Sequence, residues 1–339
     1  MGSRNKKNEI LRMLKANFNE YSSGEELSRR LEISRTAVWK HIKEMQQAGY
    51  MIEASSRKGY KLVQRPRVMN GFEIGNELGT EIIGKDVIFF DTIDSTNAYA
   101  KKIASEGAAE GTVVAAGSQS GGRGRLGRKW ESPPGAGIYF SVILRPKLPP
   151  EEVQIITLAA SAAVASAFYS LAGIRAGIKW PNDVLLDGKK VCGILTEMNS
   201  EMEQVNFIVL GIGINFSQEQ EDFPAELSEK ATSVQAYARQ QDIDISELEK
   251  LDIIRAVLKE LDGLYLLILQ KRNKDIIKCW KDYDITIGKT IRVLSGDSEY
   301  TAFVEGITDD GKLLVVSQDG GKRQVQSGEV SIRGLLGYM

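Results

Sequence analysis

The residues best suited to chemistry lie in one short segment, 121–130, which reads GGRGRLGRKW. This segment places three arginines and a lysine among four glycines. Guanidinium groups match the oxygen geometry of phosphates, and glycines let backbone N–H groups approach the same anion. We therefore predict an anion site, with phosphate as the anion that fits the pattern best. The alternatives are a basic surface loop and a second contact with DNA.

The same segment contains the spacing G-x-G-x-x-G, at 122–127, which is found in dinucleotide-binding folds. That fingerprint needs a helix directly after it and an acidic residue about 20 positions further on. Residues 128–137 read RKWESPPGAG, where two consecutive prolines exclude a helix, and Lys147 stands where the acid should be. The sequence also lacks the GK[ST] of a P-loop and the HRD and DFG motifs of protein kinases. The glycines therefore do not indicate a nicotinamide, P-loop or kinase-type site.

Two further stretches could belong to the same site. Residues 179–197 read KWPNDVLLDGKKVCGILTE, in which a tight turn places Asp183 near a strand start and Lys189 and Lys190 before a buried strand. Residues 211–215 read GIGIN, where the glycines end a strand and allow a ligand to approach Asn215 closely. Each stretch alone is also compatible with an ordinary hairpin or strand-end turn.

The composition limits the classes of chemistry. The 339 residues are 42% hydrophobic and 26% charged, which is typical of a globular protein with two or three domains. A single histidine, His41, excludes multi-histidine metal sites and disfavours Ser–His–Asp or Cys–His catalysis elsewhere. Cys192 and Cys279 lie far apart and predict small buried residues, not a disulfide framework. We see no signal peptide and no apolar run approaching the roughly 20 residues of a membrane span, so we expect a cytoplasmic protein that does not contact membranes.

The N-terminal 67 residues carry most of the positive charge. They contain 15 Lys and Arg against 7 Asp and Glu, a net charge of +8, whereas the remainder has 29 against 38, a net charge of −9. Apolar spacing predicts helices at 8–16 and 23–31 and a third, capped by Ser34, that ends before Gly49. A hairpin at 50–63 would form the wing of a winged helix-turn-helix.

This basic module predicts DNA binding, and the alternative is a protein-interaction module. The N-terminal part of the third helix would read the edges of the major groove, and the wing would contact phosphates. We expect Trp39 and His41 to be packing residues. The predicted DNA-binding residues are Arg35, Thr36, Lys40, Lys43, Arg57 and Lys58, with Lys6 and Lys7 as further phosphate contacts.

The remainder of the chain, after a polar linker that begins at Pro66, mixes strands and helices. This order predicts an α+β domain with a mixed sheet. The expected strands are 87–90, 112–117, 137–144, 177–180, 184–186, 191–198 and 206–214, and the expected helices are 95–106, 155–172, 248–270 and 274–282. Short strands at 290–294, 302–307, 313–316 and 322–326, with turns at 309–311 and 319–321, predict a separate small sheet.

Taken together, the winged helix, STN at 95–97, GRGRLGRKW at 122–130 and the stretches 179–197 and 211–215 resemble a biotin protein ligase. The resemblance is to the bifunctional form, which also represses biotin-synthesis genes, and it covers nearly the whole chain. It implies a DNA-binding domain at 1–65, a class II synthetase-like ligase domain at 66–283 and an SH3-like barrel at 284–339.

The resemblance implies a two-step reaction with ATP and biotin as substrates and Mg²⁺ as the metal. The biotin carboxylate attacks the α-phosphate of ATP, which gives biotinyl-5′-adenylate and pyrophosphate. A lysine of biotin carboxyl carrier protein then attacks the mixed anhydride, and other biotin-dependent carboxylases are further acceptors. The adenylate would also order the glycine-rich loop, promote a homodimer and act as corepressor on a palindromic operator.

The resemblance also implies roles for particular residues. Ser95, Thr96 and Gln119 hold the ureido end of biotin, and Lys190 pairs with the biotin carboxylate or the acyl-phosphate oxygen. Asp183 either binds Mg²⁺ or orients the incoming amine. The biotin-binding set is Ser95, Thr96, Asn97, Gln119, Arg123, Gly124, Arg125, Lys190 and Gly193. The adenylate set is Arg125, Arg128, Trp130 and Asn215, and within it Asn215 reads adenine. The catalytic set is Arg123, Arg125, Asp183 and Lys190.

Two other functions remain open at this point. One is a transcription factor that only senses biotin or another small acid. The four residues of the catalytic set argue against it, because a pure sensor needs no phosphate loop. The other is a lipoate ligase. The sequence motifs at 122–130 and 179–183 and the N-terminal winged helix favour a biotin ligase over it.

Overall fold

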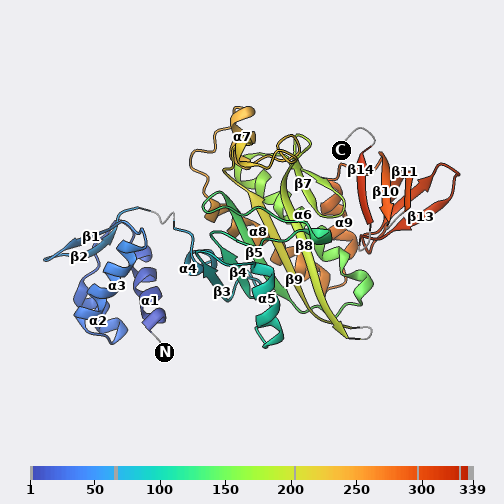
Figure 1. Ribbon diagram of the computed structural model, residues 1–339. Helices are drawn as coiled ribbons and strands as arrows, with labels where there is room; N and C mark the ends of the chain where they lie inside the picture. Colours follow the sequence, from blue (N-terminus) through green and yellow to red (C-terminus); the bar gives the residue numbers. More distant parts are fainter. Residues whose placement is uncertain (1–2, 65–67, 202–203, 296–297, 328–329, 335–339) are drawn as a thin grey trace. The chain divides into compact units, whose positions relative to one another are not determined.

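The computed structural model describes residues 3–64, 68–201, 204–295, 298–327 and 330–334 (Figure 1). The chain forms two compact units, Met1–Asn76 and Glu77–Met339. The predicted linker start at Pro66, and with it the predicted boundary between 65 and 66, lies outside the described residues. The three-way division at 1–65, 66–283 and 284–339 therefore stays a prediction.

The first unit is a winged helix-turn-helix, as predicted. Ser23 and Ser34 cap the second and third helices by accepting hydrogen bonds from the backbone N–H groups of Glu25 and Ala37. The two wing strands pair antiparallel. The elements are α1 (Ser3–Ala16), α2 (Gly24–Leu31), α3 (Arg35–Gln47), β1 (Ile52–Ser55), β2 (Gly59–Leu62) and α4 (Gly71–Gly75).

Helix α3 buries one stripe and exposes another. Val38, Ile42 and Met45 lie in the core of the first unit, and His41 is buried beside them at 6% exposure, as predicted. The prediction that Trp39 packs inside was wrong, because its side chain is 52% exposed. At 3.6 residues per turn, position 39 falls on the opposite face, between Arg35 and Lys43.

The second unit is built on a seven-stranded mixed sheet in the order β3-β4-β5-β9-β8-β7-β6. Strands β3 and β4 are parallel, and the other neighbouring strands pair antiparallel, which confirms the predicted α+β class. The strands are β3 (Val87–Phe90), β4 (Val113–Ala116), β5 (Gly137–Leu144), β6 (Gly177–Lys179), β7 (Asp183–Leu186), β8 (Lys189–Glu201) and β9 (Gln204–Asn215). Lys189 and Lys190 are thus the first residues of β8 and do not precede it.

Helices cover this sheet. Helix α5 (Thr96–Ser105) packs on β4, β5 and β9, while α6 (Gln154–Ala172) packs on α8 (Lys250–Leu269) and α9 (Asn273–Lys281), as Figure 1 shows. Alternation along β5 points Ser141 and Ile143 toward α5. A short helix, α7 (Val234–Gln240), was not predicted.

Helix α6 corrects the expectation that no apolar run approaches the length of a membrane span. Together with the turn before it, Pro150–Ala172 has 23 residues and a window of mean hydropathy 1.8, so it is long and apolar enough to cross a membrane by composition. However, 72% of that window is buried inside the protein. A helix that is apolar on all sides is typical of a protein core as well as of a membrane span.

The C-terminal strands form a separate five-stranded antiparallel sheet in the order β13-β12-β11-β10-β14. Its strands are β10 (Thr290–Ser295), β11 (Ser298–Ile307), β12 (Leu313–Ser317), β13 (Lys322–Val325) and β14 (Val330–Gly334), the last of which was not predicted. The buried Trp180 indole donates a hydrogen bond to Gly311 O at 3.0 Å, which ties this sheet to the turn between β6 and β7.

Candidate functional site

A cavity of about 740 Å³ lies in the second unit. The structure brings to this one cavity every residue that the sequence predicted for biotin, adenylate or catalysis. These residues are Ser95, Thr96, Asn97, Gln119, Arg123, Gly124, Arg125, Arg128, Trp130, Asp183, Lys190, Gly193 and Asn215. The segments that carry them are far apart in the chain, so the fold itself assembles the site.

One end of the cavity is a buried polar network at the start of α5. The backbone N–H and the hydroxyl of Thr96 both donate to Gln119 Oε1, at 2.8 and 3.1 Å. The Ser141 hydroxyl on β5 lies 2.8 Å from Thr96 Oγ1 and 2.6 Å from Asn97 Oδ1. Ser95 caps the helix by accepting from the Ala98 N–H. Such a network fixes the rotamers of neutral donors and acceptors at this end.

The floor of the cavity is made of glycines on neighbouring strands. Gly193 of β8 faces Gly213 of β9, and the indole of Trp130 lies against both. A Cβ atom at Gly213 would meet Trp130 Nε1 at 2.5 Å, and one at Gly193 would meet the same ring at 2.9 Å. Glycine is therefore required at both positions for an aromatic group to lie this close to the sheet.

The other end of the cavity is cationic. Lys190 Nζ lies 2.5 Å from Asp183 Oδ1, and the two side chains are 23% and 15% exposed. The Lys190 ammonium also lies 5.4 Å from the centre of the Trp130 ring. This end thus holds an ion pair whose ammonium also lies next to an aromatic surface.

Arg125 crosses from the glycine-rich segment to two other parts of the unit. Its guanidinium donates to Asn182 Oδ1 at 2.9 Å and also to the backbone carbonyl of Ser327. Burial lowers the pKa of Arg125, the charge of Asp183 raises it, and Arg128 lowers it further. Because arginine does not lose its proton in proteins, the consequence is a partly desolvated cation inside the cavity.

The glycine-rich segment is a loop that turns back on itself. Gly124 N–H donates to Arg128 O at 2.7 Å, and Trp130 N–H donates to Gly122 O at 3.0 Å. A short 3₁₀ turn, η1 (Arg125–Gly127), lies at its tip, where Leu126 is exposed and has a φ of 56°. The predicted exclusion of a helix after Gly127 is therefore confirmed.

Several residues of the cavity were not identified from the sequence. They come from the segment after β9, from the C-terminal sheet and from the turn before β7. Asn182, in that turn, is the one residue of this set that lies within a motif described above, although no role was predicted for it. They include Asn182, Gln218, Asp222, Phe223, Leu227 and Arg292. None of the others lies in a pattern of charges or glycines that would have indicated a ligand.

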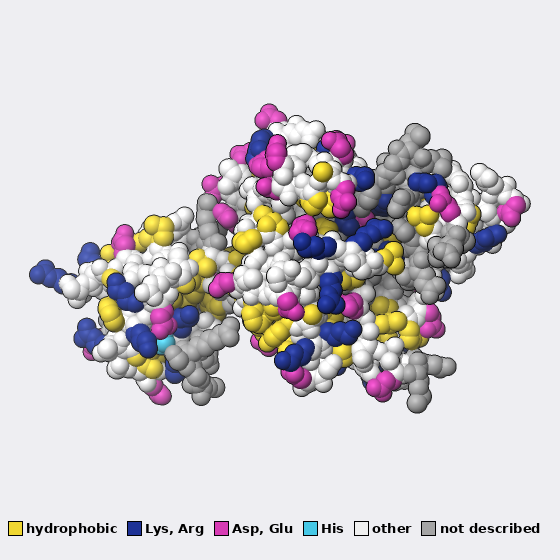
Figure 2. All heavy atoms as spheres, viewed as in Figure 1, with side chains coloured by type: hydrophobic (Ala, Val, Ile, Leu, Met, Phe, Trp, Pro, Cys, Tyr) yellow, Lys and Arg dark blue, Asp and Glu magenta, His cyan; other side chains and the backbone are white. Residues whose placement is uncertain are grey.

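The surface of the second unit separates charge by region. On the face seen in Figure 2, Lys and Arg side chains gather over the middle of this unit, whereas Asp and Glu are prominent around α7.

In the parts of the chain that the structure describes, no group of three or more His, Cys, Asp or Glu residues could hold a metal ion.

The predicted DNA-binding residues of the first unit are all exposed. Four of them share one face of α3 with Trp39, and two lie at the tip of the wing; they are Arg35, Thr36, Lys40, Lys43, Arg57 and Lys58. Of the further phosphate contacts, Lys6 donates to the carbonyl of Leu31 at 2.8 Å. The arrangement suits a polyanion on the α3 face.

Comparison with known proteins gives consistent matches along the chain. Three family profiles match: the HTH domain at 6–61, the biotin/lipoate A/B protein ligase family at 89–215 and the biotin protein ligase C-terminal domain at 286–333. The chain is 39% identical over 305 residues to the bifunctional ligase/repressor BirA of Bacillus subtilis, covering 90% of this chain and 92% of that protein. The corresponding protein of Escherichia coli is 30% identical over 314 residues, covering 93% and 94%.

A solved structure with the same fold is the biotin protein ligase from Aquifex aeolicus in complex with biotin and ATP. It has 28% sequence identity and a TM-score of 0.62, and the match covers 74% of this chain and 99% of that one.

Proposed function

Because this chain belongs to the biotin protein ligase family, in its bifunctional ligase/repressor form, we propose that it transfers biotin to a carrier lysine through biotinyl-5′-adenylate. One observation carries the proposal. A single cavity joins a neutral polar end, built on Thr96 and Gln119, to a cationic end, built on Arg125 and Lys190. Biotin has the same polarity, with a neutral ureido ring at one end and a carboxylate at the other.

In the first step, an oxygen of the biotin carboxylate bonds to the α-phosphorus of ATP, and the bond to the β-phosphate breaks to release pyrophosphate. An anion here attacks a polyanion, so fixed cations must offset the charge. Lys190 would pair with the carboxylate, and its contact with Asp183 holds the ammonium in position. Arg123 and Arg125 supply the remaining positive charge from the loop.

In this proposal the adenylate lies against Arg125, Arg128, Trp130 and Asn215, all of which line the cavity. Trp130 offers an aromatic surface at the glycine floor, and Arg128 offers a guanidinium to the phosphate. Ser95, Asn97, Gly124 and Gly193 complete the biotin part of the cavity. No protein nucleophile is needed, which suits a chain with one histidine.

In the second step, the carrier lysine amine attacks the acyl carbon, and AMP leaves with the electron pair of the broken anhydride bond. In this proposal Asp183, at the start of β7, orients the incoming amine or accepts its hydrogen bond. The acceptors are biotin carboxyl carrier protein and other biotin-dependent carboxylases, in the cytoplasm.

The cavity fits Mg²⁺ that arrives with the nucleotide. Magnesium commonly binds through one or two carboxylates together with phosphates and several waters. Asp183 would hold it, as the alternative to orienting the amine; Glu131, Asp222 and Glu226 are further carboxylates that line the cavity. When bound, the ion would neutralise phosphate charge.

The winged helix would give the second activity. Arg35, Thr36, Lys40 and Lys43 would enter the major groove, and Arg57 and Lys58 would contact phosphates. Biotinyl-5′-adenylate would order the glycine-rich loop, promote a homodimer and thereby place two winged helices on a palindromic operator. Sedimentation of the protein with and without biotin plus ATP tests this coupling, and an unchanged monomer–dimer equilibrium would contradict it.

Incubation with labelled biotin, ATP, Mg²⁺ and a carrier domain tests the ligase function directly. We expect label on the carrier lysine, and lipoate in place of biotin should give none. If the carrier stays unlabelled while the protein binds biotin, the protein is a transcription factor that senses biotin and not a ligase. Transfer of lipoate alone would identify a lipoate ligase.

A further inference from the structure

The side chain of Gln218 ends in a buried amide oxygen that lacks a partner. Gln218 follows β9, lines the cavity and is 3% exposed. Among the described residues, no group donates a hydrogen bond to its Oε1. Burying an amide oxygen without a donor is unfavourable, so native proteins rarely leave such an atom unpaired unless a ligand or water completes it.

A series of hydrogen bonds fixes which end of this amide is left over. The Thr232 carbonyl can only accept, so the Asn215 amide presents its Nδ2 to it, at 3.1 Å. Asn215 Oδ1 therefore faces Gln218 and accepts from its Nε2, at 3.3 Å. These two hydrogen bonds fix which end of each amide is the nitrogen and which is the oxygen. The atom that remains without a donor is the Gln218 oxygen.

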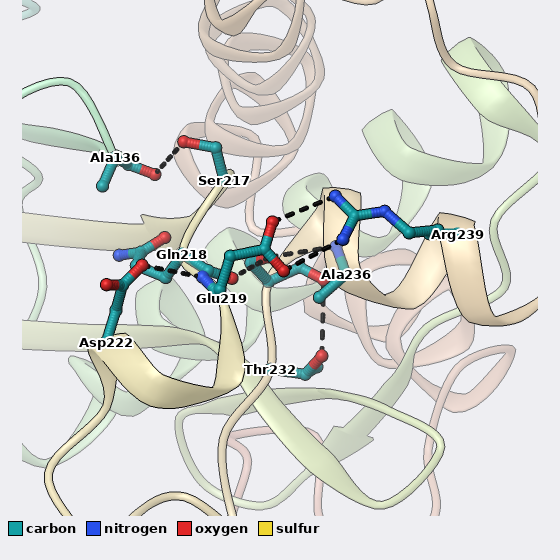
Figure 3. Close-up of polar contacts among 9 residues, drawn as sticks. Ala136, Ser217, Gln218, Glu219, Asp222, Thr232, Ala236 and Arg239 are labelled. Atoms are coloured by element: carbon teal, nitrogen blue, oxygen red, sulfur yellow. Dashed lines mark hydrogen bonds and ion pairs between the residues drawn. The ribbon is translucent and has the colours of Figure 1, made fainter.

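The backbone at Gln218 is held on both sides, as Figure 3 shows. Its carbonyl accepts from the Ser233 hydroxyl at 2.7 Å, and the Ser217 hydroxyl donates to Ala136 O at 3.3 Å. Next in the chain, Glu219 makes two hydrogen bonds of 3.0 Å with the Arg239 guanidinium of α7. An amide anchored in this way is ordered before a ligand arrives.

We propose that Gln218 Oε1 accepts a hydrogen bond from the exocyclic 6-amino group of adenine and so selects ATP. This inference rests on the proposed ATP-dependent function and adds a reader next to Asn215. The lone acceptor requires a donor, and the 6-amino group is the one that adenine presents. Hypoxanthine and guanine carry a carbonyl oxygen at that position, which would face the Gln218 oxygen without a hydrogen. In the proposed function, the donors of the biotin ureido ring lie at the Thr96–Gln119 end of the cavity instead.

The first test uses the wild-type protein and needs no variant. Biotin-dependent pyrophosphate release is measured with ATP, with purine riboside triphosphate, which lacks the 6-amino group, and with ITP. We expect kcat/KM to fall roughly tenfold for purine riboside triphosphate, the value of one buried hydrogen bond, and further for ITP. Equal use of ATP and purine riboside triphosphate would overturn the proposal. No release with any nucleotide would instead refute the ligase function itself.

The second test locates the effect at residue 218. Gln218→Met keeps the length of the side chain but removes the acceptor, together with the Nε2 donor to Asn215 Oδ1. Gln240→Met makes the same change at an exposed position of α7. We expect Gln218→Met to use ATP and purine riboside triphosphate with nearly equal kcat/KM, since the loss of the contact with Asn215 affects both nucleotides alike. Gln240→Met should discriminate as the wild type does. A folded Gln218→Met protein that still discriminates tenfold would overturn the proposal.

Discussion

Replacing Lys190 by methionine should remove most adenylate formation while leaving the protein folded. The change keeps the length of the side chain but removes a cation that lies 2.5 Å from Asp183 and in the cationic end of the cavity. Loss of one group that stabilises developing charge typically costs about 100- to 1000-fold in rate, or about 2.7–4 kcal/mol. In addition, the uncompensated Asp183 carboxylate would repel the biotin carboxylate, so we expect KM for biotin to rise as well.

The effect on stability should be smaller. Breaking a fully buried ion pair costs about 3–5 kcal/mol, but both partners here are partly exposed, so the loss of unfolding free energy should lie well below that range. Thermal unfolding without ligands measures this loss of unfolding free energy separately from the rate of adenylate formation. A Lys190→Met protein that is unfolded would make the rate uninformative, and Lys190→Arg, which keeps the charge, then serves as the second variant.

Pyrophosphate release with biotin and ATP is the appropriate assay for the first step. The matched control is Lys189→Met, since Lys189 is the neighbouring residue of β8 and does not line the cavity. Adding Asp183→Asn to Lys190→Met should restore biotin affinity in part, because it removes the repelling charge. Near-normal pyrophosphate release by Lys190→Met would refute the assigned role of this lysine.

Three further predictions concern the rest of the chain. Deleting residues 1–76 should abolish operator binding in a gel-shift assay but leave carrier biotinylation intact, because the first unit has its own core; loss of both activities would show that the units cannot be separated. Burial raises the pKa of both cysteine thiols, but Cys192 is buried and Cys279 only partly so, and iodoacetamide should therefore label Cys279 much faster than Cys192 in the folded protein, as read by mass spectrometry; rapid labelling of Cys192 would contradict its burial. Trp39→Gln should change the unfolding free energy by less than about 0.5 kcal/mol, whereas Ile42→Ala on the buried face should cost about 2–5 kcal/mol; equal losses in urea unfolding would place Trp39 in the core after all.

The sequence predicted those parts of the site that depend on local chemistry. The spacing places Asp183 and Lys190 at the starts of two strands joined by a turn, whereas their roles came from the resemblance and their contact was not predicted. In the structure, Asp183 is paired with Gly193 and Leu185 with Lys190, and Lys190 Nζ lies 2.5 Å from Asp183 Oδ1. Two prolines were enough to exclude a helix after Gly127. Patterns of this kind need no knowledge of distant segments, which is why they were predictable.

Contacts between distant segments could not be predicted in this way. Arg125 meets Ser327 across 202 positions of sequence, and Gln218 reaches the cavity only because β9 and the segment after it are placed there by the sheet. Trp39 was expected to be a packing residue although it lies off the apolar stripe of the third helix, and the structure leaves it 52% exposed. On a helix, one position is a rotation of about 100°, so neighbours in sequence lie on different faces.

The G-x-G-x-x-G spacing in the loop has a physical use that differs from its use in dinucleotide-binding folds. In those folds the glycines lead into a helix, whose N-terminus binds phosphate. Here the chain returns, and a Cβ atom at Gly122 would meet the Trp130 carbonyl at 2.4 Å, so glycine is needed for the two arms of the loop to come this close. That return places Trp130 on the glycine floor and lets Arg125 reach Asn182. The glycines therefore serve the closure of the loop, and in the proposed function its side-chain cations bind the phosphate that a helix N-terminus binds in the other fold.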